Sequence, residues 1–92
     1  MSGDDFKAKY SARELAREFT TLGMEGRGRT VYHQKVIRDF AAMKIRQHPG
    51  ENGKGLWFWL RDIRTKAPHL YERWKEKRHE LEMARIARGE AA

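Results

Sequence analysis

A run of chain-breaking residues near the middle of the chain constrains the fold most. Residues 49–55 contain one proline and three glycines, a composition that is typical of a turn and ends any helix. The residues that follow, 56–60, read Leu-Trp-Phe-Trp-Leu, and their aromatic side chains favour a β-strand. The short polar segment 44–48 before the turn is the predicted partner strand. This part of the chain is therefore predicted to be a β-hairpin.

A helix is predicted to begin directly after Ser11. Ser11 and Glu14 form a capping box, in which the hydroxyl accepts the amide hydrogen of Glu14 and the carboxylate accepts that of Ser11. Apolar residues then recur at helical spacing, and Tyr10 and Leu15 flank the cap as a hydrophobic staple requires. Gly23 is predicted to end the helix, because glycine readily takes the left-handed conformation found at helix ends.

A second helix is predicted to begin near Thr30, after a basic loop at residues 23–29 that contains three glycines. A strand over residues 30–37 is the alternative, since four of these residues are β-branched, but alternation would place Lys35 beside Val31 on one face. The helical arrangement puts apolar residues on one side: Tyr32, Val36, Ile37, Phe40 and Met43. Its outward face carries Gln34, Lys35, Arg38, Ala41 and Ala42.

The last predicted helix spans residues 65–89, with Pro68 in its first turn. Leu70, Trp74 and Leu81 give this helix an apolar side, and charged residues dominate after residue 75. Ninety-two residues are too few for two cores of useful size. The sequence therefore predicts a small α+β fold of about three helices and a hairpin, with a flexible segment at residues 1–9 and a single domain over residues 10–92.

The excess of positive charge lies in the middle of the chain. Residues 27–66 contain ten Lys or Arg and three Asp or Glu, which gives +7 and equals the net charge of the whole chain. The flanking residues nearly balance, with −1 over residues 1–26 and +1 over residues 67–92. Because cations held at a polyanion release condensed counterions, charge confined to one stretch indicates a surface for nucleic acid.

Other functional classes are not expected. The chain has no cysteine, which excludes disulfides and thiolate metal sites. Its four histidines lack metal-ligand spacing, and no nucleophile elbow or phosphate-binding loop occurs. No segment is apolar enough for a signal peptide or a membrane span. We therefore expect a cytoplasmic protein that is not an enzyme, has no membrane partner, and carries no metal or cofactor.

Three segments together resemble the winged helix-turn-helix family of DNA-binding domains. Residues 11–19 (Ser-Ala-Arg-Glu-Leu-Ala-Arg-Glu-Phe) are similar to the supporting helix, residues 29–32 (Arg-Thr-Val-Tyr) to the start of the recognition helix, and residues 49–55 to the wing. The resemblance covers roughly residues 10–63 and implies a helix in the major groove, with the wing on the phosphate backbone or in the minor groove. The seven residues 23–29 exceed the three or four of a standard turn.

The resemblance and the charge together predict a surface that prefers double-stranded DNA over RNA, as part of a small regulator or accessory factor. Cations of the loop and hairpin would contact phosphates, whereas donors of the second helix would reach base edges, since glutamine suits adenine and arginine suits guanine. A solvated helix face and an ordinary basic loop are the alternatives. The candidate residues are Arg27, Arg29, Gln34, Lys35, Arg38, Arg46, Lys54, Arg61 and Arg64.

The aromatic strand is predicted to be apolar on both faces. Leu56, Phe58 and Leu60 would share one face, and Trp57 and Trp59 the other. Such strands are usually buried, so we expect the two tryptophans to lie under the C-terminal helix together with its tryptophan. If exposed, they would instead stack on the bases of single-stranded nucleic acid or RNA, or bind a protein.

A protein-interaction module is the second predicted function. In that case the chain would be an inhibitor or accessory factor of a phage or mobile element and would dock on a nucleoprotein complex. The candidate contact residues are Trp57, Trp59, Trp74 and Leu81. Homodimerisation through the C-terminal helix is a further hypothesis, because Leu70, Trp74 and Leu81 fall at roughly coiled-coil spacing.

Overall fold

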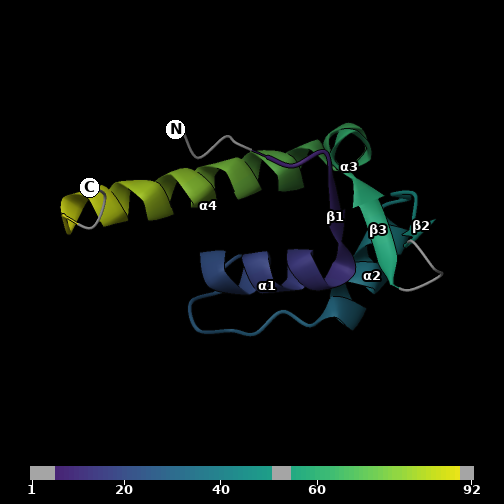
Figure 1. The fold of residues 1–92 in the computed structure, drawn as a ribbon, viewed down its shortest axis with the longest axis horizontal. Coiled ribbons are helices and arrows are strands. Elements are labelled where there is room, and N and C mark those ends of the chain that lie inside the picture. Colours follow the sequence, from purple (N-terminus) through teal and green to yellow (C-terminus); the bar gives the residue numbers. More distant parts are fainter. Residues whose placement is uncertain (1–5, 51–54, 90–92) are drawn as a thin grey trace.

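The structure is a computed structural model that describes residues 6–50 and 55–89, and it is an α+β fold built around a small antiparallel sheet (Figure 1). The elements in chain order are β1 (Lys9–Ser11), α1 (Ala12–Leu22), α2 (His33–Ala42), β2 (His48–Pro49), β3 (Leu56–Trp59), α3 (Leu60–Lys66) and α4 (Pro68–Ala87). The predicted α+β class is confirmed, but the described residues form four helices and three strands instead of about three helices and a hairpin.

Helix α1 has the boundaries that its local sequence predicts. The Ser11 hydroxyl accepts the amide hydrogen of Glu14 at 3.1 Å, and the Glu14 carboxylate accepts that of Ser11 at 2.9 Å. At the other end Gly23 has φ 69°, in the left-handed region, and its amide donates to the carbonyls of the last turn. The capping box and the glycine stop are both confirmed.

Strand β1, which the sequence did not predict, precedes α1. Tyr10 pairs with Phe58 in an antiparallel ladder, so that β3 is the central strand in the order β1-β3-β2. The ring of Phe6 packs edge-on against Trp74, with 4.8 Å between centroids. The prediction of a flexible segment over residues 1–9 is therefore wrong for residues 6–9, which take part in the sheet and the core.

Helix α2 begins at His33, and Thr30 is not its cap. The amide of Val31 donates to the Thr20 hydroxyl at 2.7 Å, and Val31 is buried, so the chain stays extended up to Tyr32. Tyr32 lies at the N-cap position with 65% of its surface exposed, and its predicted place on the apolar side of the helix is wrong. Val36 and Phe40 do face the core.

The segment between α2 and the hairpin turn is mostly not a strand. Lys44 has φ 62°, and the amide of Ile45 donates back to the Phe40 carbonyl at 2.9 Å, which closes the end of α2. Pairing with β3 begins only at His48, so the predicted strand over residues 44–48 is wrong except for its last residue. The hairpin is confirmed at its base, where the Gly50 amide donates to the Gly55 carbonyl at 3.0 Å. Lys54 lies outside the described residues.

Two helices follow β3, where one was predicted from residue 65. The chain becomes helical at Leu60, whose amide donates to the Ala8 carbonyl at 2.8 Å, and Ile63 is fully buried. Helix α3 ends at Lys66, because the proline that follows Ala67 disfavours a helical conformation of Ala67. Helix α4 then starts with Pro68 in its first turn, as predicted, and continues to Ala87.

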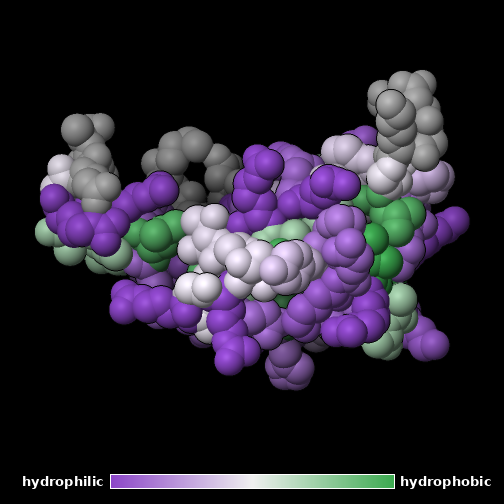
Figure 2. All heavy atoms as spheres, turned by 90° about the horizontal axis from the view of Figure 1, so that it is seen from below, coloured by the Kyte–Doolittle hydropathy of each residue, from purple (hydrophilic) through white to green (hydrophobic). Residues whose placement is uncertain are grey.

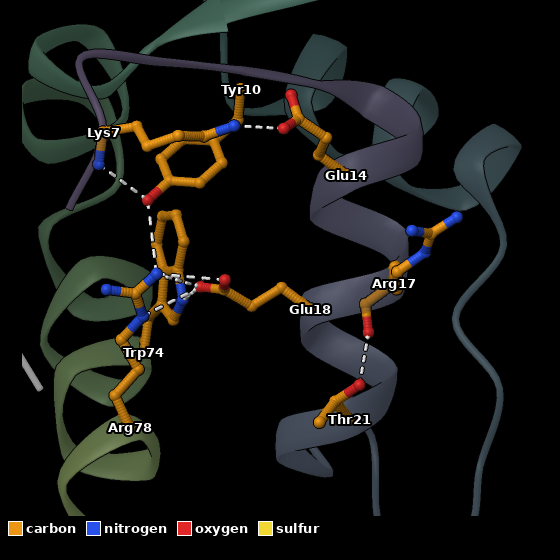
Figure 3. Close-up of polar contacts among 8 residues, drawn as sticks. All are labelled: Lys7, Tyr10, Glu14, Arg17, Glu18, Thr21, Trp74 and Arg78. Carbon is orange, nitrogen blue, oxygen red and sulfur yellow. Dashed lines mark hydrogen bonds and ion pairs between the residues drawn. The ribbon is translucent and has the colours of Figure 1, made fainter. Parts of the chain in front are cut away.

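Helix α4 is held against α1 by Trp74, which is fully buried and makes edge contacts with Tyr10 and Phe19. Figure 3 shows Glu18 reaching from α1 toward α4, where it accepts hydrogen bonds from the Trp74 indole and from Arg78. The hydroxyl of Tyr10 also accepts from Arg78, at 3.3 Å. The largest fully buried side chains are Trp74, Phe40, Phe58, Leu15 and Ile63.

Candidate nucleic-acid interface

The described basic residues of the central segment, residues 27–66, are exposed except for Lys35 and are mostly unmatched by carboxylates. Of its nine described Lys and Arg residues, seven form no ion pair with another described residue. Of the ten outside it, four pair with a glutamate, namely Lys7, Lys75, Lys77 and Arg78. The charge excess of the sequence is therefore an excess of free surface cations. These seven, called the central cations below, are Arg27, Arg29, Lys44, Arg46, Arg61, Arg64 and Lys66.

The loop between α1 and α2 presents two of the central cations from an anchored backbone. Met24 and Val31 are buried, and the Met24 carbonyl accepts a hydrogen bond from Arg73 of α4. Arg27 and Arg29, which lie between these anchors, are exposed. Figure 2 views the molecule from the side on which this loop runs, and that face is mainly hydrophilic. The loop spans ten residues, 23–32, and so exceeds a standard turn by more than the sequence predicts.

The outward face of α2 carries polar and small side chains, as predicted. Gln34 and Arg38 are exposed, and the neighbouring Ala41 and Ala42 leave the helix backbone accessible. Tyr32, which the sequence places in the core, adds an exposed aromatic ring at the start of this helix. The face thus has donors, small residues and one ring, which suits close approach to a partner.

Lys35 differs from the other predicted groove contacts. Its ammonium lies 2.6 Å from the Asp39 carboxylate and 3.4 Å from that of Glu25. The hydrogen bond to Asp39 outweighs partial burial and raises the pKa of Lys35 above its usual value. Arg38 is also near Asp39, at 3.7 Å, but remains exposed. The Lys35 ammonium is therefore paired with carboxylates of the protein itself. Gln34 and Arg38 are the donors of this face that a partner can reach.

The hairpin and α3 carry further predicted cations. Arg46 is exposed just before β2. Arg61 and Arg64 lie on α3, an element that the sequence did not predict, with their guanidinium carbons 5.2 Å from the Trp59 ring centroid and 5.3 Å from that of Tyr71. Their positions are set by aromatic neighbours, and both remain exposed.

The outer face of the sheet is only partly covered, and the prediction that α4 covers it is wrong. Trp57 and Trp59 are both partly exposed, while Trp74 packs on the opposite side with Phe6 and Tyr10. The two tryptophans border a cavity of about 510 Å³, which is also lined by Lys9, His48, Pro49, Gly50 and Phe58. Exposure of the two tryptophans was the alternative to burial in the sequence analysis.

The predicted partner-binding residues of α4 have different environments. Trp74 is fully buried and cannot contact a partner. Leu81 lines an open cleft of about 640 Å³ between α1 and α4, whose polar side chains Figure 3 shows in part. Farther along the helix, which extends past α1 in Figure 1, Met83 and Ile86 are half-exposed.

Within residues 6–50 and 55–89, no group of three His, Asp or Glu side chains is arranged to hold a metal ion. None of the described helices has the length and apolar composition that crossing a membrane requires. In comparisons with known proteins, no family model, no curated protein and no solved structure matches this chain.

Proposed function

We propose that this protein binds double-stranded DNA through a winged-helix-like surface and catalyses no reaction. The observation that carries the proposal is the exposure of the seven central cations, which have no ion pairs with described residues. A free surface cation that meets a phosphate displaces a condensed counterion and so favours binding, whereas a cation already paired with a carboxylate contributes less.

The order of the elements supports the winged-helix-like assignment. Helix α1 packs against α2, as a supporting helix would against a recognition helix, and the β2–β3 hairpin follows α2 at the place of a wing. In this arrangement α2 enters the major groove, which is about 12 Å wide and admits a helix. Gln34 and Arg38 are the side chains that would reach base edges.

Phosphate contacts are assigned to cations from three elements around α2. Arg27 and Arg29 extend from the α1–α2 loop, Arg46 precedes the hairpin, and Arg64 lies on α3. Lys54, the predicted cation of the wing tip, lies outside the described residues and keeps its sequence-based assignment. Contacts of this kind position the protein on the duplex and carry no sequence information.

A salt titration with random duplex tests the proposal. If about five phosphates are neutralised, the logarithm of the binding constant should fall against the logarithm of salt concentration with a slope of about −4 to −5. The substitutions Arg27→Gln and Arg46→Gln should each weaken binding to all duplexes alike and reduce the slope by about one. Binding no stronger than that of an unrelated protein of equal charge would overturn the proposal.

Lys77→Gln is the matched control, because it removes the same charge from α4, where Lys77 lies 3.8 Å from Glu80. It should leave the slope nearly unchanged. If Lys77→Gln weakens duplex binding as much as Arg27→Gln does, net charge alone determines the affinity, and the surface assignment is wrong.

A protein partner is the second candidate, and one observation favours it. Met83 and Ile86 are 50% and 52% exposed on the part of α4 that extends past α1. Exposed apolar side chains on one helix suit contact with another protein. Retention of duplex binding after Met83→Ser and Ile86→Ser would separate this surface from the DNA-binding surface.

A further inference from the structure

The outer face of the sheet has the chemistry of a nucleotide-binding platform. Trp57 and Trp59 lie two residues apart on β3, so their side chains project from the same face about 6.6 Å apart along the strand. Both rings are partly exposed. Every nucleobase has an aromatic face, and stacking on tryptophan therefore recognises unpaired bases without regard to their sequence.

Cations flank the two rings. The Lys9 ammonium lies 5.2 Å from the Trp57 ring centroid and 6.0 Å from that of Trp59, and the Arg61 guanidinium carbon lies 5.2 Å from the Trp59 centroid. Neither cation forms an ion pair with another described residue. Both cations are exposed. The cation–π interaction of an exposed cation with a ring is weaker than the stacking of a base on that ring. A bound nucleotide can therefore displace the cations from the rings to its phosphate.

The shape of this face favours one occupant. Its cavity of about 510 Å³ lies within the roughly 300–1,000 Å³ range of small-ligand sites. A base inside a duplex is already stacked and cannot reach a tryptophan ring. The Asp62 carboxylate lies 3.9 Å from the His48 ring nitrogen at the border of the cavity, and Lys9 and Arg61 place two positive charges beside the rings. These features fit an aromatic, anionic group that is not paired.

We infer that Lys9, Trp57, Trp59 and Arg61 bind an unpaired nucleotide of a single-stranded nucleic acid, with its base stacked on tryptophan and its phosphate between the two cations. The inference goes beyond the proposed duplex binding, because it uses the outer face of the sheet and not the outward face of α2, and it shares only Arg61 with the central cations.

Tryptophan fluorescence tests this site directly. The chain has three tryptophans, and Trp74 is fully buried, so quenching by a ligand reports on Trp57 and Trp59. The probes are an eight-nucleotide thymidine strand, its uridine counterpart, and an abasic strand with the same number of phosphates, at about 0.15 M salt. We expect the strands with bases to quench emission and to bind about tenfold more tightly than the abasic strand.

Two substitutions of Trp59 distinguish stacking of a base on the ring from apolar packing of the side chain. Trp59→Leu keeps an apolar side chain but removes the aromatic face, whereas Trp59→Phe keeps a ring. The leucine variant should bind the thymidine strand about tenfold more weakly, and the phenylalanine variant should retain most of the affinity. The thermal unfolding midpoint of each variant checks that the fold is intact.

Two results would overturn the inference. Equal affinity for the abasic strand would show that charge alone binds it, and equal affinity of the Leu and Phe variants would exclude stacking. Neither result bears on duplex binding, which is measured separately with Arg27→Gln and Arg46→Gln. Tighter binding of the uridine strand than of the thymidine strand would support the site and identify RNA as its source.

Discussion

Lys44 occupies a backbone conformation that favours glycine. Its φ of 62° is in the left-handed region, where a side chain costs about 1–2 kcal/mol. Gly23 holds the equivalent position after α1, with φ 69°. Both residues end a helix by taking the left-handed conformation. Glycine, which follows α1, takes it without strain, whereas the lysine after α2 does not.

We expect Lys44→Gly to stabilise the fold by about 0.5–1 kcal/mol, since relief of the strained backbone exceeds the added entropy of the unfolded chain. Gly23→Ala should do the reverse, at a cost of about 1 kcal/mol. No atom is closer than 3.8 Å to the position of the new methyl group, so the cost comes from the backbone and not from crowding. Urea denaturation of both variants measures the two changes, and the same sign for both would contradict this account.

At the scale of elements, α1 depends on the capping box at its first turn. Burial raises the pKa of Glu14, but hydrogen bonds from Lys7 and from the Ser11 amide, together with the charge of Lys7, outweigh it and lower the pKa below its usual value. A carboxyl whose pKa is lower in the folded chain stabilises the fold above its unfolded pKa. That stabilisation is lost as the pH falls through the folded value.

Glu14→Gln should therefore destabilise the protein by about 0.5 kcal/mol at neutral pH, because the amide can still cap the helix but carries no charge. The difference from the wild type should shrink as the pH falls through the lowered pKa of Glu14. Urea denaturation at a series of pH values measures it. A difference that stays constant with pH would show that the charge of Glu14 plays no part.

Elements set by local contacts could be predicted from the sequence, and elements set by distant contacts could not. Ser11, Glu14 and Gly23 lie within or beside the helix that they delimit, and they were sufficient to predict it. Strand β1 has only three residues and no apolar alternation, and it exists because Trp57–Trp59 pairs with it nearly fifty residues later. The break between α3 and α4 did have a local signal, since Pro68 disfavours a helical Ala67.

In the candidate sites, too, features set by nearby residues could be predicted from the sequence, and features set by distant contacts could not. The free charge of Arg27, Arg29 and Arg46 follows from the scarcity of nearby acidic residues in the sequence. The ion pair of Lys35 with Asp39, at a spacing of four residues on one helix, was also a readable signal. The exposure of Trp57 and Trp59 was not, because it depends on Trp74 packing against α1 on the other side of the fold.

At the scale of the whole molecule, one partly buried polar cluster joins α4 to α1. Glu18 and Arg78 have side chains that are 24% and 18% exposed, with the closest oxygen–nitrogen distance at 2.9 Å (Figure 3). The Trp74 indole donates to the same carboxylate. Loss of one member leaves its partners without a compensating group, which costs more than the pair itself contributes.

We therefore expect Glu18→Gln and Arg78→Met each to destabilise the protein by about 2 kcal/mol, and the double substitution to cost less than the sum. Glu72→Gln is the control, because its pair with Lys75 is exposed and 3.7 Å long, and should change stability by less than about 0.5 kcal/mol. Urea denaturation measures all four variants. Additive losses for Glu18 and Arg78 would mean that the two side chains act separately.

The position of Trp74 also affects when the fold can form during synthesis. Its aromatic partners Phe6, Tyr10 and Phe19 are made first, and Arg78 bonds to Tyr10 across 68 residues of sequence. Helix α1 can pack against α2 before α4 is made, but its contacts with Trp74 form only once α4 has emerged. Contacts of such long sequence separation slow folding and leave early segments open to association. The segments before α4 thus lack their contacts with Trp74 until α4 has been synthesised.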